Sequence, residues 1–92
     1  MALALEQNVP NPFNPSTTIQ FRVPDAGFVK LAIYGIDGQL VRSLVARHVE
    51  AGVHEAVWDG RDDAGRAVAS GVYVYRLTSD RGVISRRMVL AR

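Results

Sequence analysis

The residues best suited to chemistry in this chain are three aspartates in the segment WDGRDDAGR, residues 58–66. The carboxylates of Asp59, Asp62 and Asp63 could offer several oxygens to a hard cation such as Ca²⁺. A standard calcium loop has ligands at positions 1, 3, 5 and 12, whereas counting from Asp59 places arginine third and serine twelfth. We therefore expect no metal site but a polar turn, in which the aspartates accept hydrogen bonds from backbone amides and pair with neighbouring arginines. A calcium site is the alternative.

Three aromatic residues could stack on sugars, as rings on an exposed face of a β-sandwich can do. Their parity along the chain argues against that role. In a strand, residues two apart point to the same face. Trp58 therefore shares a face with Ala56, and Tyr73 and Tyr75 share a face with Leu77. We expect all three rings in the core, with the indole and phenol groups finding partners at its edge.

No constellation typical of catalysis occurs in the sequence. His48 and His54 lie on separate segments, and no group of histidines and acids has metal-ligand spacing. None of the serines stands in a nucleophile elbow, and no glycine-rich phosphate loop precedes a helix. Acid–base work by Glu55 and Asp59 would need a dry concave site, which so short a chain hardly offers. The sequence predicts a chain that is not an enzyme and has no cofactor.

The composition is that of one small folded domain. Hydrophobic residues make up 48% of the 92 residues and charged residues 22%, unlike a disordered tail. The net charge of +2 is too weak to predict a nucleic-acid partner. The sequence has no cysteine, so core packing must stabilise the fold without disulfides or thiolate metal sites.

The apolar runs are far shorter than the roughly 20 residues of a membrane helix. The start, MALALEQNVP, lacks the charged-then-apolar order of a signal peptide. We expect any export signal to lie upstream, in a longer parent chain.

Alternation of apolar and polar residues between glycines predicts an all-β chain. Strands are expected at residues 17–23, 28–36, 39–46, 53–58, 72–78 and 83–91, with a further short strand at 67–69 as an option. The apolar residues of 39–46 also fit one face of a short helix, but the preceding turn and the shortness of the segment favour a strand. About seven short strands predict an antiparallel, immunoglobulin-like β-sandwich.

Two turns set the pairing of the strands. Asp37-Gly38 is typical of a type I′ hairpin, in which both central residues take positive φ. Asp80-Arg81-Gly82 predicts a three-residue loop with glycine at the left-handed position. The last two strands should therefore form a terminal hairpin.

Residues 1–16 are expected to form an extended, Asn/Pro-rich lead-in to the sandwich domain of residues 17–92. The stretch PNPFNPSTTIQF, from Pro10, contains three prolines that fix φ and favour extended neighbours. It should be stiff and non-helical, and it cannot be an inner strand. We expect Phe13 to close one end of the core, a role compatible with a recognition epitope.

The terminal stretch VISRRMVLAR, from Val83, alternates apolar and other residues except at Arg86. It could be an ordinary strand whose cations protect a sheet edge. It could equally be a hairpin displayed for recognition. The residues leave both readings open.

Four stretches in order, LEQNVPNPFNPSTTIQF, VKLAIYGIDGQLVRSLV, AGVHEAVWDGRDDAGRAVASGVYVYRL and SRRMVLAR, resemble the C-terminal sorting domain of proteins exported by the type IX secretion system. The resemblance runs from about Leu5 to Arg92. The middle portion is also similar to the immunoglobulin-like domain of flagellar hook-capping proteins.

The resemblance implies a non-catalytic domain that carries an upstream cargo domain through the periplasm and across the outer membrane of a Gram-negative cell. Its partners would be the secretion translocon and a sortase-like protease that cuts upstream of Pro10 and attaches the cargo to the surface. The recognition residues that it implies are Ser70, Gly71, Tyr73, Arg86, Arg87, Met88, Val89, Leu90 and Arg92. The last segment of the family often carries lysines, and here arginines take their place.

Two other functions remain open at this level. The chain could be a carbohydrate-binding module of a secreted enzyme. It could also be a structural immunoglobulin-like module of a flagellar cap or another surface assembly.

Overall fold

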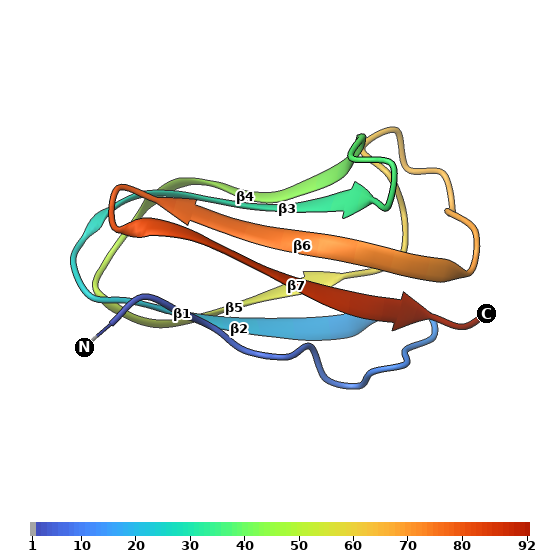
Figure 1. Cartoon of the computed structure of the whole chain (residues 1–92), viewed down its shortest axis with the longest axis horizontal. Helices are drawn as coiled ribbons and strands as arrows, with labels where there is room; N and C mark the ends of the chain where they lie inside the picture. Colours follow the sequence, from blue (N-terminus) through green and yellow to red (C-terminus); the bar gives the residue numbers. More distant parts are fainter. Residues whose placement is uncertain (1) are drawn as a thin grey trace.

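A computed structural model, which describes residues 2–92, contains two antiparallel sheets packed face to face (Figure 1). The three-stranded sheet has the order β1 (Ala4–Leu5), β2 (Thr17–Val23), β5 (Gly52–Trp58). The four-stranded sheet has the order β4 (Leu40–Val49), β3 (Gly27–Gly35), β6 (Gly71–Ser79), β7 (Gly82–Leu90). The predicted all-β, immunoglobulin-like sandwich is confirmed.

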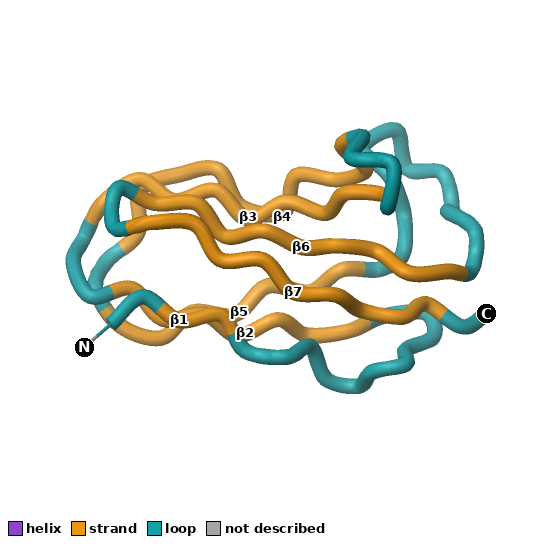
Figure 2. Tube along the Cα trace, viewed as in Figure 1, coloured by secondary structure: helices purple, strands orange, loops and turns teal. Residues whose placement is uncertain are grey.

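The strands form because their apolar residues fall on one face. In β2, Ile19, Phe21 and Val23 are buried while the residues between them are half-buried or exposed. Such alternation places every second side chain in the space between the sheets. Each large aliphatic or aromatic side chain buried there stabilises the fold by about 1.5–3 kcal/mol. Figure 2 shows the long strands spanning the molecule and the loops gathered mainly at its two ends. Among the described residues, no helix could span a membrane.

The segment that fitted either a strand or a helix is a strand. β4 pairs with β3 along its length, but the register shifts twice, between Leu31 and Ala32 and between Ile33 and Tyr34. A shift of this kind interrupts the alternation of faces. The apolar residues of β4 therefore lack a strict period of two, which is why they also matched a helix face.

The predicted type I′ turn at Asp37-Gly38 is wrong. Gly38 has φ +87°, but no residue other than glycine has positive φ in the described chain. The amide of Gly38 donates to the carbonyl of Gly35 at 2.9 Å, and the amide of Gly35 donates to the carbonyl of Gln39 at 2.9 Å. The loop thus has three residues with glycine alone at the left-handed position, a common hairpin geometry.

The terminal hairpin is confirmed, with a shorter loop than predicted. Ser79 pairs with Gly82, so only Asp80 and Arg81 lie in the turn. Gly82 has φ +140°, a positive value that favours glycine, as expected for this position. β6 and β7 then pair in register along their whole length.

Two further differences concern short strands. Residues 67–69 form no strand, because only Ala67 bridges, to Arg61. In contrast, β1, which was not predicted, pairs Ala4 with Arg22 and Leu5 with Phe21. A strand of two residues has no period from which it could be recognised.

The lead-in lies between the two sheets at the open side of the sandwich. Val9 exchanges backbone hydrogen bonds with Thr18 of β2, both at 2.9 Å. Farther along, Phe13 donates to the carbonyl of Val89 and accepts from the amide of Ala91, both at 3.0 Å. In Figure 1 this blue segment runs from β1 toward the end of β7. The lead-in therefore covers the outer edge of β7 over its C-terminal part, from Arg87 onward.

Candidate recognition site on the terminal hairpin

The register of the terminal hairpin divides the predicted recognition residues into two faces. Tyr73 pairs with Met88, and Gly71 pairs with Leu90, on the face toward the core. Val72 pairs with Val89, and Val74 with Arg87, on the outer face. The recognition residues named above are therefore not one continuous surface.

Three of them serve the core. Met88 and Leu90 are fully buried. Tyr73 is half-buried and packs edge-on against Trp58, with ring centroids 5.3 Å apart and planes at 72°, a favoured aromatic geometry. Its hydroxyl donates to the carbonyl of Ala69 at 2.6 Å. A partner could contact Met88 or Leu90 only if the sandwich opened.

Arg86 has a structural contact that explains why it interrupts the alternation. It lies on the inward-facing row of β7, where its guanidinium donates to the backbone carbonyl of Leu5. Leu5 belongs to β1 of the other sheet. Arg86 thus joins the two sheets at the open side of the sandwich, where an apolar residue would lie beside an exposed edge.

Arg92 and Ser70 hold the end of the chain against the loop that precedes β6. The amide of Arg92 donates to Oγ of Ser70 at 3.0 Å, and its guanidinium donates to the carbonyls of Val68 at 2.9 Å and Gly60 at 2.7 Å. A Cβ at Gly60 would lie 2.7 Å from Nη2 of Arg92. Gly60 therefore provides the room that this contact needs.

Arg87 and Val89 remain as residues whose side chains lie on the outer face. Their backbone groups are occupied by the lead-in: the carbonyl of Arg87 accepts from Nε2 of Gln7 at 2.7 Å, and the amide of Val89 donates to Oδ1 of Asn11 at 2.9 Å. The Arg87 side chain is exposed, and that of Val89 is half-buried. Among the β7 residues implied in recognition, Arg87 and Val89 therefore have side chains on the outer face, whereas the exposed Arg86 is bonded to the carbonyl of Leu5 on the inward row.

The aspartate-rich loop is a polar turn, as expected. Oδ1 of Asp62 accepts from the amides of Ala64 and Arg66 at 3.0 and 2.9 Å. The backbone hydrogen bond from Arg66 is the main reason that the pKa of Asp62 lies below its usual value. The turn is therefore organised by its own backbone amides.

The other two aspartates fasten this loop to β4. Oδ1 of Asp63 accepts from the amide of Ser43 at 3.0 Å, and Oδ1 of Asp59 accepts from Nη1 of Arg42 at 3.2 Å. Each candidate metal-ligating carboxylate thus has bonds within the protein. No group of three potential metal ligands occurs within residues 2–92.

The three rings considered for sugar stacking face the core, as their parity predicted, with Tyr73 half-buried at its edge. Trp58 and Tyr75 are fully buried, and the Trp58 indole donates to the carbonyl of Arg61 at 2.9 Å. Phe13 packs against Trp58 with centroids 5.5 Å apart, so the lead-in does close one end of the core. The sugar-stacking platform that these rings could have formed does not exist.

A buried polar cluster, which the sequence analysis missed, attaches the lead-in to the sandwich. The Tyr75 hydroxyl donates to the carbonyl of Glu6 at 2.7 Å and accepts from the amide of Asn8 at 3.0 Å. Nδ2 of Asn8 donates to Oγ1 of Thr17 at 3.1 Å. Burial raises the pKa of Tyr75, because the phenolate would lose its hydration. An isolated asparagine beside a proline tract gives no sequence signal for such burial.

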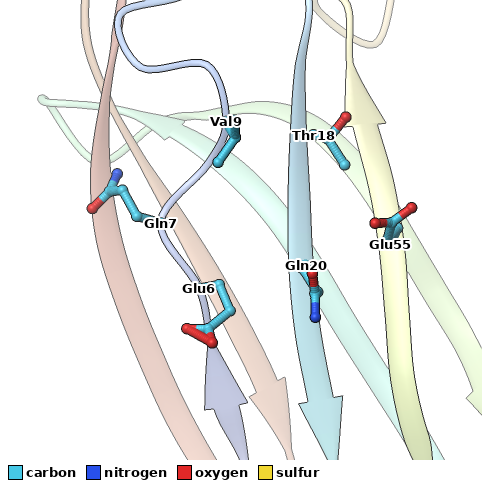
Figure 3. A pocket seen from close by; sticks show the side chains of 6 residues that line it. All are labelled: Glu6, Gln7, Val9, Thr18, Gln20 and Glu55. Carbon is cyan, nitrogen blue, oxygen red and sulfur yellow. The ribbon is translucent and has the colours of Figure 1, made fainter.

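A shallow hollow lies over the outer face of the three-stranded sheet (Figure 3). Its lining is Glu6, Gln7, Val9, Thr18, Gln20 and Glu55. Figure 3 shows these side chains on three neighbouring segments, the lead-in, β2 and β5, with the two carboxylates on separate segments. The residues are exposed or half-buried, so the hollow offers none of the dry volume that acid–base chemistry requires.

Comparison with known proteins gives the family of the domain. The family described as FlgD Ig-like domain matches residues 10–82. The basal-body rod modification protein FlgD of Salmonella typhimurium is 39% identical over 46 residues, which are 50% of this chain and 20% of that protein. The chain therefore spans about a fifth of the length of the curated relatives that it matches.

Solved structures share the fold at low identity. FlgD from P. aeruginosa has a TM-score of 0.63 and 20% identity, covering 82% of this chain and 60% of that chain. Latent dimeric PorU from Porphyromonas gingivalis has a TM-score of 0.72 and 23% identity, covering 98% and 9%. PorZ of the same organism, described as an essential surface component of the type IX secretion system, has a TM-score of 0.63 and 22% identity, covering 98% and 11%.

The family match spans most of the chain, from the proline tract through the terminal turn, and the fold is shared with structures of FlgD, PorU and PorZ. The chain thus belongs to the FlgD Ig-like domain family.

Proposed function

We propose that this chain is a non-catalytic sorting and surface-attachment domain, which directs a cargo protein through the type IX secretion system. The observation that carries the proposal is the combination of the sorting-domain motifs with a sandwich that matches PorU and PorZ over 98% of this chain. In those proteins the matching region is 11% or less of the whole chain. This proportion is compatible with a small module attached to a large cargo.

The site geometry supports a binding role and gives no support to an enzymatic one. The loop aspartates are bonded within the protein, and the hollow of Figure 3 is open to solvent. What the hairpin does offer is an exposed outer face next to Arg87. The proposed partners are the outer-membrane translocon and a sortase-like protease, and the proposed location is the cell surface, reached through the periplasm.

A second candidate is a structural module of a flagellar cap or similar assembly. The family match and the 39% identity to a basal-body rod modification protein favour it. Export by the sorting domain would depend on the type IX translocon, whereas a structural module would not direct a cargo through it. A carbohydrate-binding role is disfavoured because Trp58 and Tyr75 are fully buried.

The test is export of a reporter. Residues 2–92 are fused to the C-terminus of a periplasm-directed fluorescent protein in a host with the type IX system, and protease-accessible reporter on intact cells is measured. We expect the fusion on the surface and the reporter alone in the periplasm. Equal retention of both would contradict the proposal and favour the structural module.

Deletion of the last strand is not a suitable variant for this test, because two of its side chains are in the core. Deleting residues 85–92 would remove Met88 and Leu90 from the hydrophobic core, so loss of export could then reflect misfolding. Substitutions of exposed side chains are the sharper probe.

A further inference from the structure

We propose that the outer face of the terminal hairpin docks a protein partner that presents an apolar side chain beside a carboxylate. The docking surface, here called the outer hairpin patch, consists of Ile36, Val72, Val74, Val89 and Arg87. This inference rests on the proposed function and specifies which surface of the domain is recognised and by what chemistry.

The patch is apolar and open. Val72 and Val89 are opposite each other across β6 and β7, and Val74 is opposite Arg87. Ile36, in the loop after β3, is 80% exposed, and Val72 is 42% exposed. Ile36, Val72, Val74 and Arg87 line one hollow of about 380 Å³. Clustered apolar residues around a concave surface are typical of a protein contact site.

Arg87 supplies the charge of the patch. The ion pairs within residues 2–92 involve Arg42, Arg66 and Arg81, but not Arg87. An exposed guanidinium beside valines can form a bidentate pair with a carboxylate on a docked surface, where exclusion of water strengthens the bond. The partner that complements this patch is therefore apolar with an acidic group opposite Arg87.

A second positive charge lies nearby on the same face. Arg76 follows Val74 by two residues on β6, and its guanidinium lies 4.9 Å from the centroid of the Tyr34 ring. Tyr34 is opposite Val74 on β3. This cation–π contact keeps a cation beside the patch, so the potential there favours an acidic partner further.

Strand addition at β7 is a less suitable mode of recognition. Between Arg87 and Ala91 the outward backbone groups already bond to Gln7, Asn11 and Phe13 of the lead-in. A partner strand would have to displace these bonds before it could pair with that edge. The side chains of the outer face need no such displacement.

The experiment compares matched pairs of surface substitutions in the reporter fusion. The test variant is Ile36→Thr with Val72→Thr. The control is Val53→Thr with Val57→Thr, two exposed valines of β5 on the other sheet. The charge variants are Arg87→Glu and Arg87→Lys. Thermal unfolding of each purified domain is measured alongside export, since exposed substitutions should change stability by only about 0.5 kcal/mol.

We expect surface display to fall by about tenfold or more for the test pair and for Arg87→Glu, the effect of losing about 1.4 kcal/mol of binding. Arg87→Lys should lose less display than Arg87→Glu, because lysine keeps the positive charge but cannot form the bidentate pair, and the β5 control should match the unsubstituted fusion. If the test pair and the β5 control show equal surface display, the proposed apolar contact with the partner is wrong. If Arg87→Glu and Arg87→Lys show equal surface display, the inference that the partner has an acidic group opposite Arg87 is wrong. Retention of the unsubstituted fusion in the periplasm would instead overturn the proposed function, and with it this inference.

Discussion

Tyr75 connects three parts of the molecule through a single hydroxyl. Its ring is buried between the sheets, while the hydroxyl donates to the carbonyl of Glu6 and accepts from the amide of Asn8. Both partners belong to the lead-in. The stability of the sandwich and the position of the lead-in therefore depend on the same group.

Replacing Tyr75 with phenylalanine should destabilise the domain by about 1–3 kcal/mol, because the buried amide of Asn8 loses its acceptor. The free energy of unfolding is measured in urea. Tyr73→Phe is the matched control, since that hydroxyl bonds only to the carbonyl of Ala69 in an exposed contact. An equal loss of unfolding free energy in both variants would contradict the greater stabilisation expected from the buried hydrogen bonds of Tyr75.

Asp62 should make the domain sensitive to acid. Its pKa is lowered in the fold mainly by the backbone hydrogen bond from Arg66. A carboxylate with a lowered pKa contributes stability that is complete above its unfolded pKa, near 4, and that is lost as the pH falls through the folded value. Stability measured in urea from pH 7 to pH 2 should therefore fall less steeply in Asp62→Asn. Glu50→Gln removes a negative charge elsewhere and serves as the control. Parallel curves for Asp62→Asn and the unsubstituted domain would contradict the assignment.

The arginines show what parity alone could not predict. The alternation of apolar residues showed that Arg86 occupies a position expected to be apolar. The structure explains this, because Arg86 donates a hydrogen bond to the carbonyl of Leu5 on β1, 81 residues away along the chain. Arg92 likewise reaches the carbonyls of Val68 and Gly60. Contacts of this kind depend on the packing of distant segments, which no local pattern contains.

At the scale of the strands, the sequence was sufficient wherever apolar residues alternate. β2, β3, β5, β6 and β7 lie close to where the pattern predicted them. β1 was missed because it is too short to show a period. The strand at β4 was predicted, but a helix also fitted its apolar residues because β4 is shifted twice against β3. The lead-in was predicted to be extended, but its bonds to Thr18 and Val89 could be seen only in the fold.

Gly38 provides a test of the hairpin between β3 and β4. Its φ of +87° disfavours a side chain, yet a Cβ there would have no neighbour within 4 Å. Gly38→Ala should therefore cost about 1–2 kcal/mol of folding stability from backbone conformation alone. Gly27→Ala is the control, because its Cβ would make only an ordinary contact, 3.8 Å from Asp80. Unfolding in urea measures both, and an unchanged Gly38→Ala would contradict the left-handed turn.

The whole molecule is a sandwich whose open side is closed by its own lead-in. The lead-in covers the edge of β7 from Arg87 onward, Arg86 bridges to β1, and Phe13 fills one end of the core. These contacts leave the outer face of the terminal hairpin as the accessible part of the segment to which the sorting resemblance points. The proposed recognition surface is thus the outer face of β6 and β7, whereas their inner face packs in the core.

The most direct measurement is surface display of the unsubstituted fusion in two hosts that differ only in the type IX translocon. We expect protease-accessible reporter on cells that have the translocon and reporter confined to the periplasm in cells that lack it. Equal display in both hosts, or periplasmic retention in both, would contradict a sorting role for this domain.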